Sequence, residues 1–285
     1  MGKKQAKMAI VYDFDGTLSP GNMQEYNFIP ELEMSPKKFW SEVENKSRKD
    51  KSDKILTYMH WMLEKAKSKE IRVLKSNFRS RGKKVELFKG VKPWFNRINE
   101  YGTAQRISIE HYIISSGLHE MIDGTPIRGA FKKVFASSFV YDHHGVACWP
   151  AISINYTTKT QFLFRINKGC LDLWDDTEIN KYIQKSERRI PFERMIYIGD
   201  GETDVPCMKL VKEQGGHSIA VYRPHAPRKK ALSLIKQGRV NFVLPADYRK
   251  NKLLDKTVHL IIHKIADDVK LTKILQPKII NGKKA

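Results

Sequence analysis

The chain has 285 residues, 41% of them hydrophobic, which is enough for one large domain or for a core with a smaller insert. Its net charge of +21 at pH 7 favours anionic ligands, without choosing between a phosphate ester, a nucleic acid and an acidic membrane. Its scattered cysteines do not form a disulfide framework, and no apolar run approaches the roughly 20 residues of a membrane span, so we expect a cytoplasmic protein that does not bind membranes.

The first predicted strand ends in two aspartates. The apolar run 9–12 is followed by Asp13, Phe14, Asp15, Gly16 and Thr17. Strand side chains alternate between faces, so Asp13 and Asp15 point the same way while the chain stays extended. Two carboxylates so close repel each other unless a cation lies between them, and Mg²⁺ prefers such oxygen ligands. A strand followed by a polar Asp-Gly turn is the alternative.

A helical insert is predicted over residues 21–90. Ser35-Pro36 is a typical helix start, and the apolar residues of 55–63 follow helical spacing, as does a shorter set over 71–78. The insert is rich in basic residues, which form either a solvated face or a source of one arginine that reaches a bound phosphate. These residues are Arg72, Lys75, Arg79, Arg81, Lys83 and Lys84.

The next segment predicts a helix over 93–101, stopped by Gly102, and then a strand over 107–114. Ser115, Ser116 and Gly117 follow directly. A hydroxyl and free amides after a buried strand can hold a phosphoryl oxygen, although most such loops are ordinary turns.

Residues 134–142 predict a strand pair or a strand and a turn, and His143-His144 predict a polar turn rather than a metal site, because no further ligand is suitably spaced. Thr158 is the predicted N-cap of the following helix. Lys159 then lies in the first turn, where positive charge is unfavourable, which suggests that carboxylates or a phosphate hold it there. Lys168 suits the other end of this helix. The acidic run 172–178 is predicted to be an exposed loop.

A second acidic motif follows the predicted strand 195–198: Gly199, Asp200, Gly201, Glu202, Thr203, Asp204. The glycines let the backbone approach a metal or phosphate closely. A helix cap explains Asp204 but leaves Asp200 unexplained. Further elements are predicted in the remaining chain: strands over 217–221 and 240–244, a basic helix over 228–236, an amphipathic helix over 253–265 and a frayed basic tail over 278–285.

Strands that alternate with helices predict an α/β fold with a Rossmann-like, doubly wound parallel sheet. Ligands bind such sheets at the carboxyl ends of the strands, so we expect Asp13, Asp15, Ser115 and Asp200 at one edge. The predicted organisation is a discontinuous core over 1–20 and 91–285, with a helical cap over 21–90.

This order of motifs resembles the haloacid dehalogenase-like superfamily. The residues that carry the resemblance are Asp13-Phe14-Asp15-Gly16-Thr17, Ser115, Lys159 and Gly199-Asp200-Gly201-Glu202-Thr203-Asp204. The resemblance spans about residues 8 to 245 and places residues 21 to 90 where members of the superfamily carry a helical cap.

The resemblance implies a role for each matching residue. Asp13 is the nucleophile that becomes an aspartyl-phosphate, and Asp15 is the acid that protonates the leaving alcohol and then the base that activates water. Lys159 neutralises the nucleophile and the phosphate. Mg²⁺ is the implied cofactor, ligated by Asp13, the Asp15 backbone carbonyl and Asp200, with Asp204 in support. The implied phosphate-binding residues are Gly16, Thr17, Ser115, Ser116, Gly117 and Lys159.

The sequence departs from the pattern of the superfamily in two places, which leaves the substrate and the active-site lysine open. Phosphoserine phosphatases look closest in cap placement, but their substrate-binding glutamate falls at Asn22 here, and Glu25 is out of register. Lys159 lies farther from Asp200 than expected, so Lys168 is a second candidate for the active-site lysine.

The predicted function is a Mg²⁺-dependent hydrolase of small phosphomonoesters. Asp15 argues for a phosphatase or phosphotransferase, because dehalogenases of the superfamily lack this aspartate and its pumping ATPases have threonine there. One alternative is a nucleic-acid-binding protein or nucleic-acid-end phosphatase that uses the +21 charge, a less favoured partner class. The other is a phosphotransferase. The substrate and oligomeric state are not predicted.

Overall fold

The computed structural model describes residues 5–281 and, apart from residue 230 and residues 276–281, their side chains. A seven-stranded sheet in the order β4-β3-β2-β1-β5-β6-β7 forms the centre, and each neighbouring pair is parallel except β3 and β4. The predicted α/β fold with a parallel sheet is therefore confirmed. The strands are β1 Ala6–Tyr12, β2 Ile107–Leu118, β3 Phe131–Tyr141, β4 Ala147–Ile152, β5 Met195–Gly199, β6 His217–Tyr222 and β7 Phe242–Pro245.

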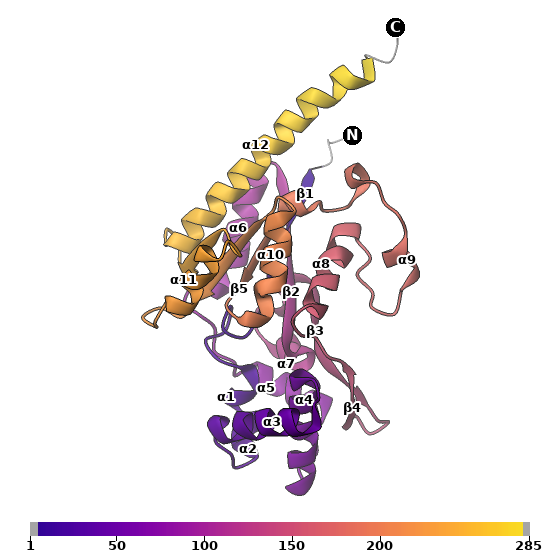
Figure 1. Cartoon of the computed structure of the whole chain (residues 1–285), viewed down its shortest axis with the longest axis vertical. Coiled ribbons are helices and arrows are strands. Elements are labelled where there is room, and N and C mark those ends of the chain that lie inside the picture. Colours follow the sequence, from indigo (N-terminus) through magenta and orange to yellow (C-terminus); the bar gives the residue numbers. More distant parts are fainter. Residues whose placement is uncertain (1–4, 282–285) are drawn as a thin grey trace.

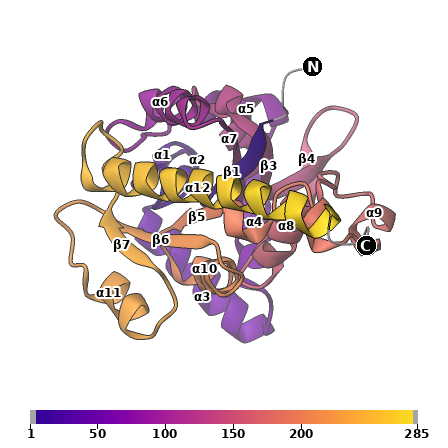
Figure 2. The ribbon, with the colours of Figure 1, turned by 90° about the horizontal axis from the view of Figure 1, so that it is seen from above.

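Helices cover both faces of the sheet (Figures 1 and 2). Helices α6 and α12 pack on one face, and α8 and α10 on the other. The α-helices are α1 Met23–Tyr26, α2 Phe28–Glu31, α3 Pro36–Asp50, α4 Lys54–Ser68, α5 Lys75–Gly82, α6 Val91–Ala104, α7 His119–Gly124, α8 Thr158–Lys168, α9 Thr177–Asn180, α10 Val205–Glu213, α11 Lys229–Lys236 and α12 Leu253–Asn281.

Strand β1 lies in the middle of the sheet, and its side chains pack into the hydrophobic clusters on both faces of the sheet. Met8, Ile10 and Tyr12 belong to the cluster under α6 and α12, whereas Ala9 and Val11 belong to the cluster under α8 and α10. All five are completely buried. Alternating side chains that are apolar on both faces are typical of a central parallel strand, and β1 delivers the residues after Tyr12 to the carboxyl edge.

The helical insert predicted after β1 comprises α1 to α5, at the lower end of Figure 1. The Ser35 hydroxyl accepts a hydrogen bond from the Lys38 amide, so this predicted N-cap is confirmed. Phe78 of α5 lies 5.5 Å from Phe28 of α2 and stacks on Phe139 of β3 at 5.8 Å, between ring centroids. The insert thus shares a core with the sheet, and the exact boundaries 21 and 90 stay a prediction.

Several predicted boundaries were wrong. Helix α6 continues through Gly102, where a Cβ would lie 3.1 Å from the Ile107 carbonyl oxygen, so packing on β2 rather than a helix stop explains this glycine. Strand β2 runs to Leu118 and includes Ser115–Gly117, which were expected in a loop. Thr157, not Thr158, is the N-cap of α8.

Other elements differ less. His143-His144 form the predicted polar turn between β3 and β4, and α9 occupies part of the acidic run expected as a loop. Helix α12 continues to Asn281 instead of ending at Ile265, because residues 266–275 contain neither a glycine nor a proline that would stop it. Of the predicted tail, residues 282–285 lie outside the described residues. Within residues 5–281, no helix is both long and apolar enough to cross a membrane.

Candidate active site

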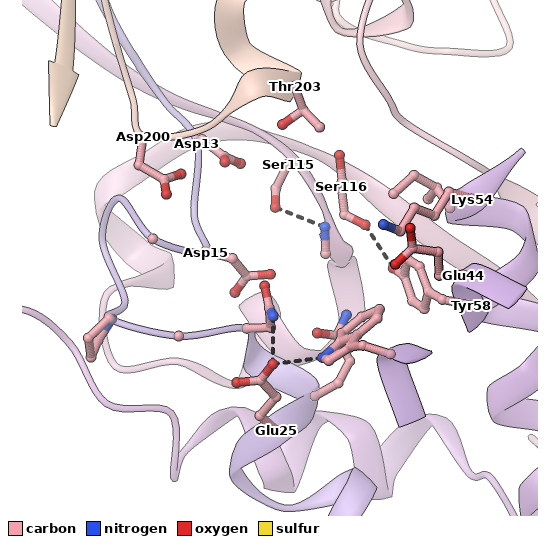
Figure 3. A pocket seen from close by; sticks show the side chains of 18 of the residues that line it. Asp13, Asp15, Glu25, Glu44, Lys54, Tyr58, Ser115, Ser116, Asp200 and Thr203 are labelled. Atoms are coloured by element: carbon pink, nitrogen blue, oxygen red, sulfur yellow. Dashed lines mark hydrogen bonds between the residues drawn. The ribbon is translucent and has the colours of Figure 1, made fainter. Parts of the chain in front are cut away.

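The carboxyl ends of β1, β2 and β5 open into a pocket of about 780 Å³ between the sheet and the helical insert (Figure 3). Asp13 and Asp15 follow β1, Ser115 and Ser116 lie near the end of β2, and Asp200 follows β5. The structure therefore brings together the aspartates and serines that the sequence singled out. These residues lie together because the carboxyl ends of parallel strands meet at one edge of the sheet.

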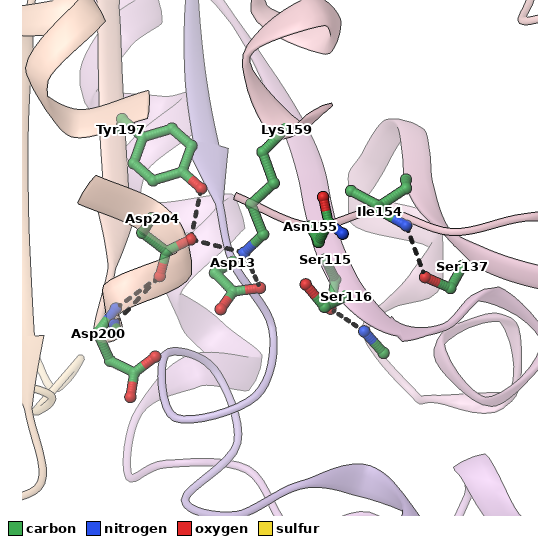
Figure 4. Close-up of polar contacts among 12 residues, drawn as sticks. Asp13, Ser115, Ser116, Ser137, Ile154, Asn155, Lys159, Tyr197, Asp200 and Asp204 are labelled. Atoms are coloured by element: carbon green, nitrogen blue, oxygen red, sulfur yellow. Dashed lines mark hydrogen bonds and ion pairs between the residues drawn. The ribbon is translucent and has the colours of Figure 1, made fainter. Parts of the chain in front are cut away.

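Asp13 lies at the base of the pocket and is 6% exposed. Its backbone amide donates to the Ile198 carbonyl at 2.9 Å, which extends the β1–β5 pairing by one residue. Its Oδ1 lies 3.2 Å from the Nζ of Lys159 (Figure 4). Burial and the neighbouring Asp204 carboxylate raise the pKa of Asp13, and the Lys159 ammonium opposes this rise.

Lys159 lies in the first turn of α8 and is fully buried. Its Nζ also donates to Asp204 Oδ1 at 2.7 Å. Although burial favours the neutral amine, the carboxylates of Asp13 and Asp204 raise the pKa of Lys159, so it stays an ammonium. These two carboxylates therefore offset the unfavourable positive charge at the start of α8.

Lys168 is not at the site. Its Nζ donates to the carbonyl oxygens of Ile179 and Lys181 at 2.6 and 2.7 Å and so ties α8 to the α9 segment. Of the two candidate lysines, the structure places Lys159 beside Asp13.

Asp204 is the most fully hydrogen-bonded carboxylate of this group. Its Oδ1 accepts from Lys159 and, at 2.7 Å, from the Tyr197 hydroxyl. Its Oδ2 accepts from the backbone amides of Asp200 and Gly201, each at 3.2 Å. With both oxygens engaged, Asp204 holds the loop after β5 in place and positions Lys159.

The Asp200 carboxylate lies directly over Gly16. A Cβ on Gly16 would overlap it, and Gly16 has φ +77°, in the left-handed region that favours glycine. Asp200 is open to the pocket, yet desolvation by surrounding atoms and repulsion from Asp204 and Asp13 raise its pKa.

The donor set at this point fits a hard divalent cation. Asp13, Asp200 and Asp204 each offer an oxygen within 4.8 Å of the others. Carboxylate oxygens are the ligands that Mg²⁺ prefers. Burial first, and repulsion between the neighbouring carboxylates second, raise the pKa of Asp13 and of Asp200, and a bound cation would offset both effects.

Asp15 reaches the pocket two residues after Asp13. Its Oδ1 accepts from the Met23 amide at 2.9 Å, and a Cβ on Gly117 would lie 2.8 Å from its Oδ2. Desolvation, followed by repulsion from Asp13, raises the pKa of Asp15 well above that of an ordinary aspartate. Asp15 is therefore suited to carry a proton.

The Ser115 hydroxyl accepts from the Gly117 amide at 3.0 Å, which leaves its proton free to donate. The Ser116 carbonyl accepts from the Tyr58 hydroxyl at 2.7 Å, a contact between the insert and β2. Ser116 Oγ has no hydrogen-bond partner among the described residues. Thr17, a predicted phosphate-binding residue, is fully buried and does not line the pocket; its carbonyl accepts from the buried Tyr248 hydroxyl at 2.8 Å.

The sequence matches the model of the haloacid dehalogenase-like hydrolases over residues 10–209. The chain belongs to this family. An uncharacterised protein of Borreliella burgdorferi is 28% identical over 281 residues, covering 89% of this chain and 96% of the relative.

Solved structures of low sequence identity share the fold. A HAD family hydrolase of Salmonella enterica serovar Typhi superposes with a TM-score of 0.58 at 17% identity, over 92% of this chain and 73% of that one. A substrate-bound phosphoserine phosphatase superposes with a TM-score of 0.54 at 13% identity, over 84% and 93%. The predicted resemblance to the haloacid dehalogenase-like superfamily is confirmed.

The sequence analysis of this haloacid dehalogenase-like hydrolase did not predict which residues of the helical insert line the pocket. Glu25, set aside as out of register, lies in the wall, where its Oε1 accepts from Trp40 Nε1 at 2.7 Å and Asn22 Nδ2 at 2.6 Å. Helical periodicity identifies which face of a helix is apolar but not which polar residues meet a ligand, so no signal in the sequence separated these residues from a solvated surface.

The basic residues highlighted in the insert do not line this pocket. Arg81 is 8% exposed, pairs with Glu31 and lies over the rings of Phe28 and Phe78. Its ion pair with Glu31 joins α5 to α2. Of the two interpretations of these basic residues, the one in which an arginine reaches the phosphate is therefore not supported for this pocket; Lys37 and Lys54 line it instead.

Proposed function

We propose that this chain is a Mg²⁺-dependent phosphomonoester hydrolase that acts through an aspartyl-phosphate on a small phosphorylated substrate. One observation carries the proposal: Asp13, held beside a buried lysine, opens into a pocket that it shares with Asp15. A nucleophile, a neutralising cation and an acid are thereby assembled around one cavity.

In the first step, an oxygen of the Asp13 carboxylate attacks phosphorus and the bond from phosphorus to the leaving oxygen breaks. Asp15, whose raised pKa favours the protonated form, donates its proton to the leaving alcohol. In the second step, Asp15 removes a proton from water, the water oxygen attacks phosphorus, and the bond to Asp13 breaks. Inorganic phosphate leaves, and Asp13 is again a carboxylate.

The remaining residues manage charge. Lys159 offsets the charge of Asp13 and of the phosphoryl oxygens. The Ser115 hydroxyl can donate a hydrogen bond to one of these oxygens. Asp13, Asp200 and the Asp15 backbone carbonyl would hold Mg²⁺, which when bound neutralises phosphoryl charge. Asp204 serves the site by positioning Lys159 and the loop that carries Asp200.

The test is hydrolysis of a simple aryl phosphate with and without Mg²⁺. We expect turnover that is lost with a chelator and restored by Mg²⁺, and a loss of at least about 10³-fold in kcat for Asp13→Asn, because the amide cannot attack phosphorus. Asp172→Asn is the matched control, since Asp172 pairs with Lys133 at an exposed position outside the pocket.

A second measurement addresses the intermediate. Enzyme quenched in acid during turnover should carry one phosphoryl group on the peptide that contains Asp13, and hydroxylamine should release it. Undiminished turnover by Asp13→Asn would reject the mechanism. Transfer of phosphate to an added alcohol instead of water would favour the phosphotransferase alternative.

A further inference from the structure

The wall of the pocket formed by the insert carries two lysines whose side chains make no hydrogen bond or ion pair within the part of the chain that the structure describes. Lys37 is the second residue of α3, and Lys54 is the first residue of α4. Both are exposed, and both line the pocket. Lysine in the first turn of a helix opposes the helix dipole, so helix stability does not account for either residue.

The acidic residues of the same wall already have protein partners. Glu25 accepts from Trp40 and Asn22, and Glu44 accepts from Arg48 at 2.7 Å. Arg48 offsets the charge of Glu44, whereas Glu25 keeps its negative charge because Trp40 and Asn22 are neutral donors. Among the described residues, Lys37 and Lys54 are the charged side chains of this wall that have no polar partner, so they are free to bind an anion.

This wall lies across the pocket from the reacting groups. In Figure 3, Lys54, Glu44 and Tyr58 occupy one side of the cavity, and Asp13 and Asp200 the other. A cavity of about 780 Å³ holds far more than a phosphoryl group, and pockets of this size enclose ligands with a substantial organic part. A phosphoryl group bound at Asp13 thus leaves room for the leaving group to extend toward the two lysines.

We propose that the substrate is a phosphomonoester whose leaving group carries a second anionic group, a carboxylate or a further phosphate, which Lys37 and Lys54 bind. This inference rests on the proposed function and adds the substrate class to it. The two ammonium groups act as point charges, so they select an anion without demanding one planar shape.

The test compares aryl phosphates that differ in one substituent: phenyl phosphate, 4-(carboxymethyl)phenyl phosphate, benzene-1,4-diyl bisphosphate and 4-(aminomethyl)phenyl phosphate. The specificity ratio is defined as kcat/KM for a substituted compound divided by kcat/KM for phenyl phosphate. For the native enzyme we expect a ratio of about 10 or more for at least one anionic compound, and a ratio below one for the ammonium compound. The carboxylate and phosphate arms identify which anion is preferred.

The variants localise the preference. Lys54→Gln and Lys37→Gln should each lower the ratio for the anionic compound several-fold, and Lys54→Glu should raise the ratio for the ammonium compound above that for the anionic one. Lys38→Gln is the matched control, because Lys38 is an exposed neighbour on α3 that does not line the pocket; its ratios should equal those of the native enzyme.

The outcomes separate the two proposals. Hydrolysis of every compound at similar kcat/KM, or equal ratios in the native and Lys54→Glu enzymes, would overturn the substrate class while the phosphatase assignment stands. If no compound is hydrolysed in the presence of Mg²⁺, the phosphatase assignment fails and the substrate class fails with it.

Discussion

At the scale of single residues, the interior of this protein is organised by polar groups that find their partners far away in the sequence. His111 of β2 is 2% exposed; its Nδ1 lies 3.1 Å from the Tyr12 hydroxyl and its Nε2 3.0 Å from Asn99 Oδ1. The Tyr12 hydroxyl accepts from Trp94 Nε1 at 2.8 Å, and its own proton is then available to His111 Nδ1. A neutral imidazole with its proton on Nε2, which can donate to Asn99, satisfies all of these contacts.

Burial lowers the pKa of His111 from 6.5 to about 3. Between these values the unfolded chain binds a proton that the folded chain does not, so the free energy of unfolding should fall as the pH falls from about 6.5, by up to about 1.4 kcal/mol per pH unit. His111→Gln removes this contribution. Urea unfolding at pH 7 and pH 5 measures it: the native protein should lose more stability between the two pH values than the variant. Equal losses would show that His111 does not titrate on unfolding.

At the scale of elements, the helical insert is fastened to the loop that leads into α8. Asp53 is the N-cap of α4, where its Oδ1 accepts from the amides of Ile55 and Leu56 at 2.9 and 2.8 Å. The same carboxylate accepts from the side chains of Ser153, at 3.4 Å, and Asn155. One residue therefore starts the helix that carries Lys54 and joins it to the segment before Lys159.

Asp53→Ala should cost about 1–2 kcal/mol of stability through the lost cap and should also raise KM for the substrate, since the wall of the pocket is no longer tied to the α8 loop. Chemical denaturation and steady-state kinetics measure the two effects. Ser35→Ala removes the exposed N-cap of α3, which has no such second contact, and should lower stability alone. A KM for Asp53→Ala equal to that of Ser35→Ala would mean that the junction does not shape the pocket.

At the scale of the whole molecule, 52 basic residues against 31 acidic ones make the surface strongly positive. Such a charge attracts any polyanion, and binding that arises from counterion release declines steeply with salt. The charge therefore makes a nucleic acid the alternative partner, less favoured than a small phosphomonoester.

We expect oligonucleotide binding to weaken by at least about 10²-fold between 50 and 200 mM salt and to show no preference for sequence. We also expect a 5′-phosphorylated oligonucleotide to be dephosphorylated no faster than an aryl phosphate. Fluorescence anisotropy and phosphate release measure the two quantities. Tight binding that persists in salt, or preferential removal of the terminal phosphate, would instead support the nucleic-acid-end phosphatase.

The sequence by itself was sufficient for the fold class and for the aspartates of the site. The alternation of strand side chains and the glycines beside Asp15 and Asp200 are local signals in the sequence. Because parallel strands share one carboxyl edge, these signals predict that Asp13, Asp15 and Asp200 lie close together. Only the tertiary structure separated Lys159 from Lys168, because both lie at ends of the same helix and differ in what surrounds them. It alone brought Lys37 and Lys54 to the pocket, since the packing of the insert against the sheet depends on contacts such as Phe78 with Phe139, which no periodicity encodes.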